Sequence, residues 1–306
     1  MWKTQRKRLE RRRLFIWQSR GIGQSRHAWI GFLLPSLLGV AVFVLAPFLD
    51  VVKRSFLTAV TEEWTGVGNY QTVFVNQAFR LAVSNTLRFT AVCLPMLIGL
   101  GLFLAVQLSR LKQMQLIKSM FLFPLAMPAA TVVLIWKMLF SEPGFLNSGL
   151  SSLGLLPGGE PVDYMGTGAA FWVLVFSYIW KNLGYTIVLW LAGILTVSTD
   201  MTEAARVDGA SESQCFWRVV FPNLKGSLYT ITVLSFLNSF KVFREAYLVA
   251  GSYPHESMYL LQHLFNNWFV NLELDKMAAA AVYVGMVLFL AILFLQRLWD
   301  QDEREA

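Results

Sequence analysis

The stretch "FWVLVFSYIWKNLGYTIVLWLAGIL", residues 171–195, decides the structural class of this chain. It is almost wholly apolar, and a helix of about 20 such residues, rising about 1.5 Å per residue, crosses the hydrocarbon core of a bilayer. Because the apolar runs of the chain do not alternate as barrel strands do, they indicate membrane-spanning helices. We therefore predict an all-α membrane protein with six transmembrane helices. The six runs are 28–50, 86–108, 117–139, 171–195, 227–250 and 277–297.

The composition agrees with this class. Hydrophobic residues make up 56% of the chain and charged residues 15%, whereas soluble domains have about 45–50% and about 25%. The two cysteines lie in segments that are not expected to meet, and the three histidines are scattered, so neither a disulfide nor a metal site is predicted. The net charge of +7 suits membrane topology and anionic lipid headgroups, and it requires no nucleic-acid partner.

The distribution of positive charge predicts the orientation. Seventeen Lys and Arg fall at the two ends of the chain and in the second and fourth loops, and four fall in the loops on the opposite side. Because positively charged loops remain in the cytoplasm, both termini are expected there. This gives a basic cytoplasmic segment at 1–27, a six-helix domain at 28–297 with a cytoplasmic loop at 200–222, and a tail at 298–306.

Polar and ionisable residues inside the apolar runs are a second feature. Lys181 lies near the middle of its run, and Lys241 and Glu245 are spaced i, i+4, so these two can pair on one helix. Intramembrane charges usually face a bundle interior or an aqueous cavity. Two interpretations stay open, a translocation path and structural pairing between helices. The path candidates, which share helix faces, are Lys181, Asn182, Tyr185, Ser235, Asn238, Lys241 and Glu245.

The polar stretch "EAARVDGASESQCFWRVVFP", residues 203–222, separates the fourth and fifth runs. Asp200 followed by Glu203 fits a capping box, which predicts a short helix from there to about Val207. Gly209 is expected to bend the chain after it, since glycine takes conformations that other residues resist.

A second short helix is predicted within the same stretch. Ser211 with Gln214 repeats the capping pattern, and Pro222 is expected to stop the helix. Phe216 and its neighbours give this helix an apolar face. From the residues alone, that face can lie on the membrane surface or dock a cytoplasmic partner.

The residues "EAARVDGA", followed by Phe216 and Pro222, resemble the EAA signature of the membrane-spanning permeases of bacterial ATP-binding-cassette (ABC) importers. In that family the segment forms a coupling helix that sits in a groove of the ATPase subunit. Two further stretches, "FLFPLAMPAATVVLIWKMLF" followed by "PGFLNSGL", and "GVGNYQTVF", resemble the sugar-type branch. Gly226 departs from it, because the branch often has proline there. The coupling residues implied by the resemblance are Glu203, Ala204, Ala205, Asp208, Gly209, Ala210, Phe216 and Pro222.

The resemblance implies a type I importer permease in a bacterial inner membrane, in contact with lipids. Its implied partners are a second permease subunit, a cytoplasmic ATPase dimer and an extracellular or periplasmic solute-binding protein that delivers a sugar. The chain has no G-x-x-x-x-G-K-[ST] loop, so it is expected to be no enzyme and to hold no cofactor, with ATP and Mg bound by the partner ATPase. The alternative is an ion-coupled secondary transporter that uses Lys181, Lys241 and Glu245.

Overall fold

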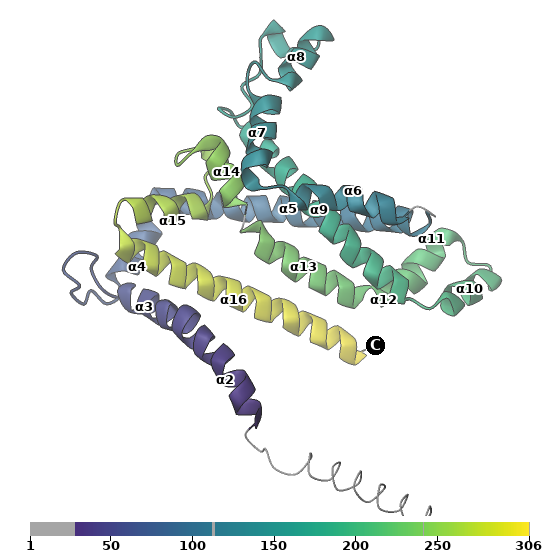
Figure 1. Ribbon diagram of the computed structural model, residues 1–306, viewed down its shortest axis with the longest axis horizontal. Helices are drawn as coiled ribbons and strands as arrows, with labels where there is room; N and C mark the ends of the chain where they lie inside the picture. The colour runs from purple at the N-terminus through teal and green to yellow at the C-terminus, as the bar shows by residue number, and fades with distance from the viewer. Residues whose placement is uncertain (1–27, 112–113, 241, 306) are drawn as a thin grey trace, which may run out of the picture. The chain divides into compact units, whose positions relative to one another are not determined.

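The computed structural model describes residues 28–111, 114–240 and 242–305, which form helices and loops without a β-strand. The predicted basic segment 1–27 lies outside the described residues. The chain divides into two compact units, with the boundary after Arg54. The first unit is helical from its first described residue, and it has no buried side chain among those described. Its elements are α2 (Ala28–Val40), the π-helical η1 (Ala41–Leu45) and α3 (Ala46–Arg54) (Figure 1).

The second unit begins at Ser55 and contains the remaining helices (Figure 1). They are α4 (Gly68–Val75), α5 (Gln77–Ser109), α6 (Met114–Ala126), α7 (Ala129–Phe140), α8 (Phe145–Ser152), η2 (Pro157–Gly159), α9 (Ala169–Thr196), α10 (Thr199–Val207), α11 (Glu212–Cys215), η3 (Phe216–Val220), α12 (Phe221–Asn223), α13 (Lys225–Ser239), α14 (Phe243–Ala250), η4 (Glu256–Met258), α15 (Leu261–Val270) and α16 (Leu274–Glu305).

Five helical stretches among the described residues are long and apolar enough to cross a membrane. Three of them fall on predicted runs as the helices α5, α9 and α16, a fourth overlaps the run 28–50 in the first unit, and the fifth overlaps the end of the run 117–139. The prediction of a helical membrane protein is therefore confirmed. The five stretches are Leu33–Arg54, Gln77–Ser109, Ala129–Ser152, Ala169–Thr196 and Leu274–Arg297.

Two runs that were expected to be single helices are interrupted. The run 117–139 is divided into α6 and α7 at Met127 and Pro128, because proline lacks an N–H and disfavours helical geometry in the residue before it. The run 227–250 is divided into α13 and α14. At this second break the carbonyl of Phe240 accepts a hydrogen bond of 2.6 Å from the side chain of Gln262.

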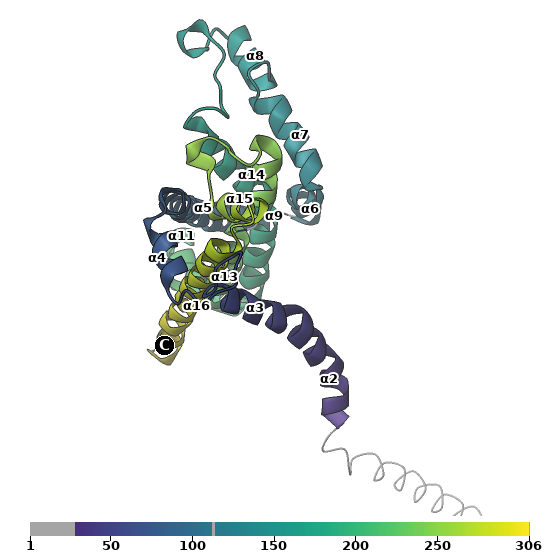
Figure 2. The same cartoon turned by 90° about the vertical axis from the view of Figure 1, so that its left-hand side faces the viewer.

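The helices α5 and α9 form the central pair of the second unit, and α6 and α13 also pack against α9 (Figures 1 and 2). Apolar residues of α5 and α9, among them Phe89 and Tyr178, form the core between them. Gly184 allows the backbones of α9 and α6 to approach closely, since a Cβ there would lie 2.0 Å from the carbonyl oxygen of Phe121. Small residues serve this purpose between membrane helices.

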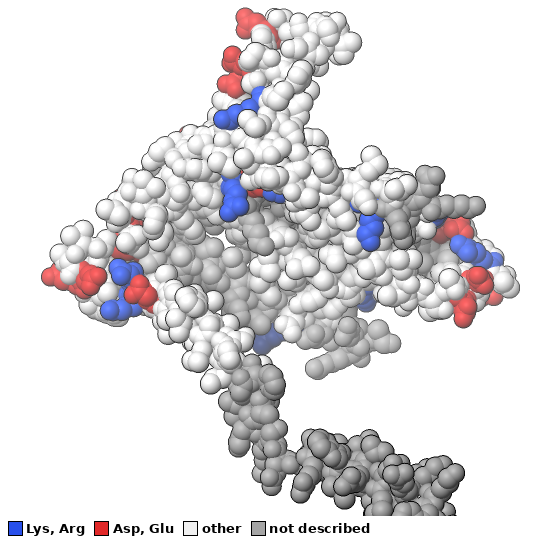
Figure 3. All heavy atoms as spheres, in the orientation of Figure 1, with Lys and Arg blue, Asp and Glu red and all other residues white. Residues whose placement is uncertain are grey.

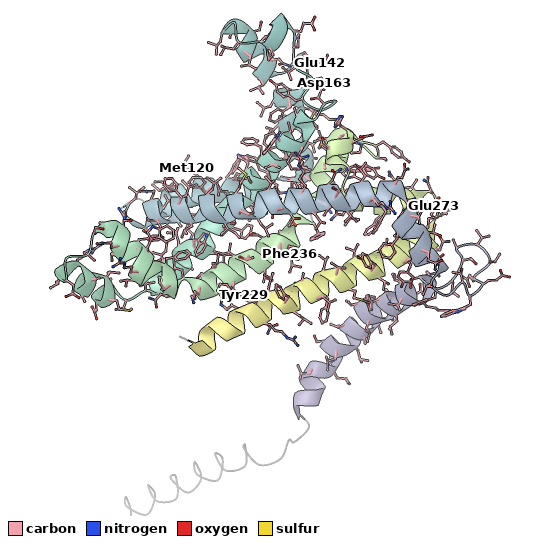
Figure 4. The ribbon with its side chains drawn as sticks, turned by 180° about the vertical axis from the view of Figure 1, so that it is seen from behind. Met120, Glu142, Asp163, Tyr229, Phe236 and Glu273 are labelled. Atoms are coloured by element: carbon pink, nitrogen blue, oxygen red, sulfur yellow. The ribbon has the colours of Figure 1, made fainter. Side chains whose placement is uncertain are left out.

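Charged residues gather away from this apolar pair. The helices α7 and α8 project from it (Figure 2), and Glu142 and Asp163 lie on that projection, apart from Met120 of α6 and Phe236 of α13 (Figure 4). Figure 3 shows a second charged group over α10 and α11 and a third at the left of the view, with a few Lys or Arg side chains on the otherwise uncharged surface between. This distribution is typical of a protein whose middle lies in lipid.

Candidate functional site

A cavity of about 250 Å³ lies between helices of the second unit. It lies beside the break between α13 and α14, and residues on both sides of the break contribute to its wall. Two of the path candidates on α9 and two on α13 and α14 meet here. The lining residues are Leu125, Ser177, Tyr178, Lys181, Asn182, Asn238, Val242 and Glu245.

An ion pair joins two walls of the cavity. The Lys181 ammonium on α9 donates a hydrogen bond to the Glu245 carboxylate on α14. Only 22% of the lysine side chain and 8% of the glutamate side chain are exposed. Glu245 thus reaches across to α9, while Lys241, its predicted partner on the same helix, lies outside the described residues. Two charges held in low-polarity surroundings depend on each other, since separating them leaves a buried charge.

Tyrosine hydroxyls join α9 to α13 beside the cavity. The Tyr178 hydroxyl donates a hydrogen bond of 2.8 Å to the backbone carbonyl of Ser235. The hydroxyl of Tyr185 lies 2.9 Å from the Ser235 Oγ. Tyr185 and Ser235 are therefore placed at a helix contact, and they are not among the residues that line the cavity.

Two asparagines bring amide groups to the cavity wall. The Asn182 Nδ2 donates to the backbone carbonyl of Tyr178 at 2.8 Å, which leaves the side-chain oxygen of Asn182 as an acceptor. Within the described parts of the chain, the side-chain amide of Asn238 makes no hydrogen bond. Amides both donate and accept, so these groups suit a ligand that carries hydroxyls.

The helix α15 contacts both sides of the break between α13 and α14. Beside the Gln262 hydrogen bond to Phe240, the ring of His263 packs edge-to-face on Phe243 at 4.9 Å between centroids. His263 is fully buried, and burial lowers its pKa to about 4. The sequence did not predict that Gln262 and His263 contact this break, since the segment that carries them has no periodic pattern or motif.

The polar stretch after α9 folds into the two expected short helices. The first, α10, ends at Val207 as predicted, but its N-cap is Ser198, whose side chain accepts from the backbone N–H of Asp200 at 3.2 Å. The predicted cap at Asp200 is therefore wrong by two residues. Gly209 follows with φ of +86°, a conformation that favours glycine.

The second helix begins as predicted and ends differently. Ser211 and Gln214 form a reciprocal capping box, with hydrogen bonds of 3.3 and 2.9 Å. Pro222 does not stop the helix. It lies in the first turn of α12, where a missing N–H is tolerated, and only Leu224 separates α12 from α13. The stretch therefore continues almost directly into the helix that carries Asn238.

The surface of this stretch is both charged and apolar. The Arg206 Nε donates to the Glu212 carboxylate at 2.9 Å, and this hydrogen bond lowers the pKa of Glu212. Arg110, from the end of α5, lies 3.7 Å from the same carboxylate. Val207 and Trp217 are 87% and 57% exposed. The segment thus has exposed apolar side chains next to exposed charged ones.

Residues 97–305 match the protein family described as "Binding-protein-dependent transport system inner membrane component". The chain belongs to this family. It is 31% identical to the trehalose/maltose transport system permease MalF of Thermococcus litoralis, over 75% of this chain and 79% of that protein. It is 26% identical to the lactose transport system permease LacF of Rhizobium radiobacter, over 91% and 95% of the two chains. These relatives are transport permeases, which agrees with the resemblance noted from the EAA residues.

A solved structure agrees in fold. It is the crystal structure of a bacterial ABC transporter involved in the import of the acidic polysaccharide alginate, with a TM-score of 0.79, 20% identity, and coverage of 90% of this chain and 95% of that one. At this identity the likeness bears on fold alone. It shows that this chain has the fold of a chain of that transporter.

Proposed function

We propose that this chain is the transmembrane permease subunit of an ATP-driven, binding-protein-dependent importer for a sugar or oligosaccharide. It forms half of the translocation pathway, with a second permease supplying the other half. In this proposal α6 with α7, and α13 with α14, each make one kinked crossing, which gives six crossings and two cytoplasmic termini. The observation that carries the proposal is the polar, ion-paired cavity at the break between α13 and α14.

The cavity suits a ligand rich in hydroxyls. Charged and polar side chains at membrane depth usually face an aqueous cavity, and Asn238 and the ion pair of Lys181 with Glu245 line this one. The amide of Asn238 and the hydroxyl of Ser177 present donors and acceptors to the same space. The relatives named for lactose and for trehalose/maltose favour a sugar as that ligand.

The segment 203–222 couples the cavity to a separate ATPase dimer, which binds ATP and Mg. Its exposed apolar residues Val207 and Trp217 offer a docking surface, and the bend at Gly209 fixes the angle between its two helices. Since α12 leads almost directly into α13, a push on the segment moves the helix that carries Asn238. An external binding protein delivers the sugar, and the rigid-body movement alternates access to the cavity.

The test is a pull-down of the solubilised chain from its native host, with Glu203→Lys beside the unmodified chain. Recovery of an ATPase, a second permease and a binding protein is expected, with the ATPase lost from the variant. Glu142→Lys, the same charge reversal on the projection formed by α7 and α8, is the matched control and should retain the ATPase. A lone chain that moves sugar under an ion gradient without ATP would contradict the proposal and support the alternative built on Lys181, Lys241 and Glu245.

A further inference from the structure

The charges on the described cavity wall cancel. Among the described residues that line the cavity, Lys181 and Glu245 are the two charged side chains, and each is the ion-pair partner of the other. The remaining polar groups of the wall are hydroxyls and amides. Lys181, the cation among the described lining residues, is therefore committed to an internal carboxylate and is not free to bind an anion, while Lys241 lies outside the described residues.

We propose that the pair of Lys181 and Glu245 selects ligands by charge, so that the cavity accepts uncharged sugars and rejects acidic ones. This rests on the proposed function and adds to it the class of sugar. An acidic sugar carries a carboxylate that loses hydration on entering the cavity, and it gains only if a cation is available to pair with it. Here the Lys181 ammonium is already paired, and the Glu245 carboxylate repels the incoming charge.

An uncharged sugar meets no such penalty. Its hydroxyls can donate to the carboxylate oxygens of Glu245 that Lys181 leaves open, because a carboxylate has about four acceptor positions. They can also exchange hydrogen bonds with the amide of Asn238, which makes none within the described parts of the chain. In this proposal the negative charge of Glu245 distinguishes neutral sugars from acidic ones. Glu245 is therefore the residue that determines specificity.

The geometry indicates what neutralising Glu245 would do. Both residues line the cavity, and 22% of the lysine side chain is exposed against 8% of the glutamate side chain. A compact ammonium on a flexible stem reorients easily. In Glu245→Gln the freed ammonium becomes a binding site for a carboxylate. In Lys181→Met with Glu245→Gln, both charges are gone and no such site is created.

The experiment measures equilibrium binding to the purified complex that contains the full chain, without its binding protein. The probes are labelled lactose, maltose and digalacturonate. The unmodified complex is expected to bind a neutral disaccharide at least about tenfold more tightly than digalacturonate, and Glu245→Gln should gain digalacturonate affinity on the order of tenfold. The double variant should show no such gain. Glu273→Gln, the same change in the Glu273–Lys276 ion pair of 3.1 Å outside the cavity, is the matched control.

Two results would overturn the inference. One is digalacturonate binding to the unmodified complex as tightly as the neutral disaccharides. This result tests the native ion pair directly, and it does not depend on the folding of a variant. The other is a gain in the double variant equal to that of Glu245→Gln. Failure of the proposed function gives a different result, because the pull-down then recovers no ATPase with the chain, whichever sugars bind.

Discussion

The chain holds two ion pairs of similar chemistry in opposite surroundings. Lys181 and Glu245 join α9 to α14 with 22% and 8% of their side chains exposed, whereas Arg206 and Glu212 join α10 to α11 with 52% and 59% exposed. Removing one charge from the first pair leaves the other in low-polarity surroundings, while in the second pair water solvates what remains. Burial therefore decides what each pair does. The buried pair joins two helices at the cavity wall, and the exposed pair joins the two short helices of the segment that we propose docks the ATPase.

The largest expected effect comes from breaking the inner pair. Lys181→Met leaves the Glu245 carboxylate buried without its partner and should lower the free energy of unfolding by about 3–5 kcal/mol. Thermal denaturation in one detergent measures this. Arg206→Met, the matched change in the outer pair, should leave the melting temperature almost unchanged. Equal losses in the two variants would contradict the comparison, as would a failure of Glu245→Gln to restore stability when combined with Lys181→Met.

A buried histidine extends the comparison to pH. Burial lowers the pKa of His263 to about 4 from an ordinary 6.5. Between these two pH values, His263 is therefore protonated in the unfolded chain and neutral in the folded chain. Stability is full above about pH 6.5 and falls as pH drops toward 4, by about 3 kcal/mol at most. Unfolding measured from about pH 7 to about pH 4 should show this slope, and His263→Phe should flatten it. His255→Gln is the control, and an unchanged slope in His263→Phe would count against the assignment.

Two glycines in opposite surroundings sharpen the comparison further. Gly184→Ala places a Cβ 2.0 Å from the carbonyl oxygen of Phe121, so α6 and α9 must separate, at a cost of about 2 kcal/mol. Gly99→Ala, on α5 with no atom within 4 Å of the added Cβ, should be neutral or slightly stabilising. Chemical denaturation of the two variants in parallel decides this. Equal stability would mean that the close approach of the helices is unimportant.

The exposed glycine should affect coupling more than stability. Gly209 has φ of +86° and open space around it, so Gly209→Val strains the bend locally by about 1–2 kcal/mol and changes the angle between α10 and α11. Sugar uptake per ATP hydrolysed in proteoliposomes should fall. Gly154→Val, at a φ of +66° in the loop after α8, imposes similar strain and should leave that ratio intact. An unchanged ratio of sugar uptake to ATP hydrolysis in Gly209→Val would mean that the bend is not needed for coupling.

Local features of this fold could be predicted from the sequence. The helices α5, α9 and α16 follow from apolar length, and the capping box at Ser211 and Gln214 follows from side chains three residues apart. Such features depend on near neighbours in the chain. Two prolines, Pro124 and Pro128, lie in the third run, and the break between α6 and α7 includes the second of them.

Long-range features could not be predicted in this way. Glu245 pairs with Lys181, 64 residues away, and the carbonyl of Phe240 at the break accepts a hydrogen bond from Gln262 of a later helix. The run of polar residues in the fifth apolar stretch suggested one continuous face. Tertiary packing instead brings Asn238 and Glu245 to the same cavity from two separate helices.

The central claim is that the space beside Asn238 is a path with alternating access. Asn238→Cys, in a chain with Cys93→Ala and Cys215→Ser, can be treated with a membrane-impermeant thiol reagent in sealed vesicles of each orientation. We predict labelling from the cytoplasmic side without nucleotide, labelling from the outer side when the ATPase is trapped closed, and slower labelling with sugar present. Protection of the introduced thiol in every state, or labelling that ignores nucleotide, would contradict the claim.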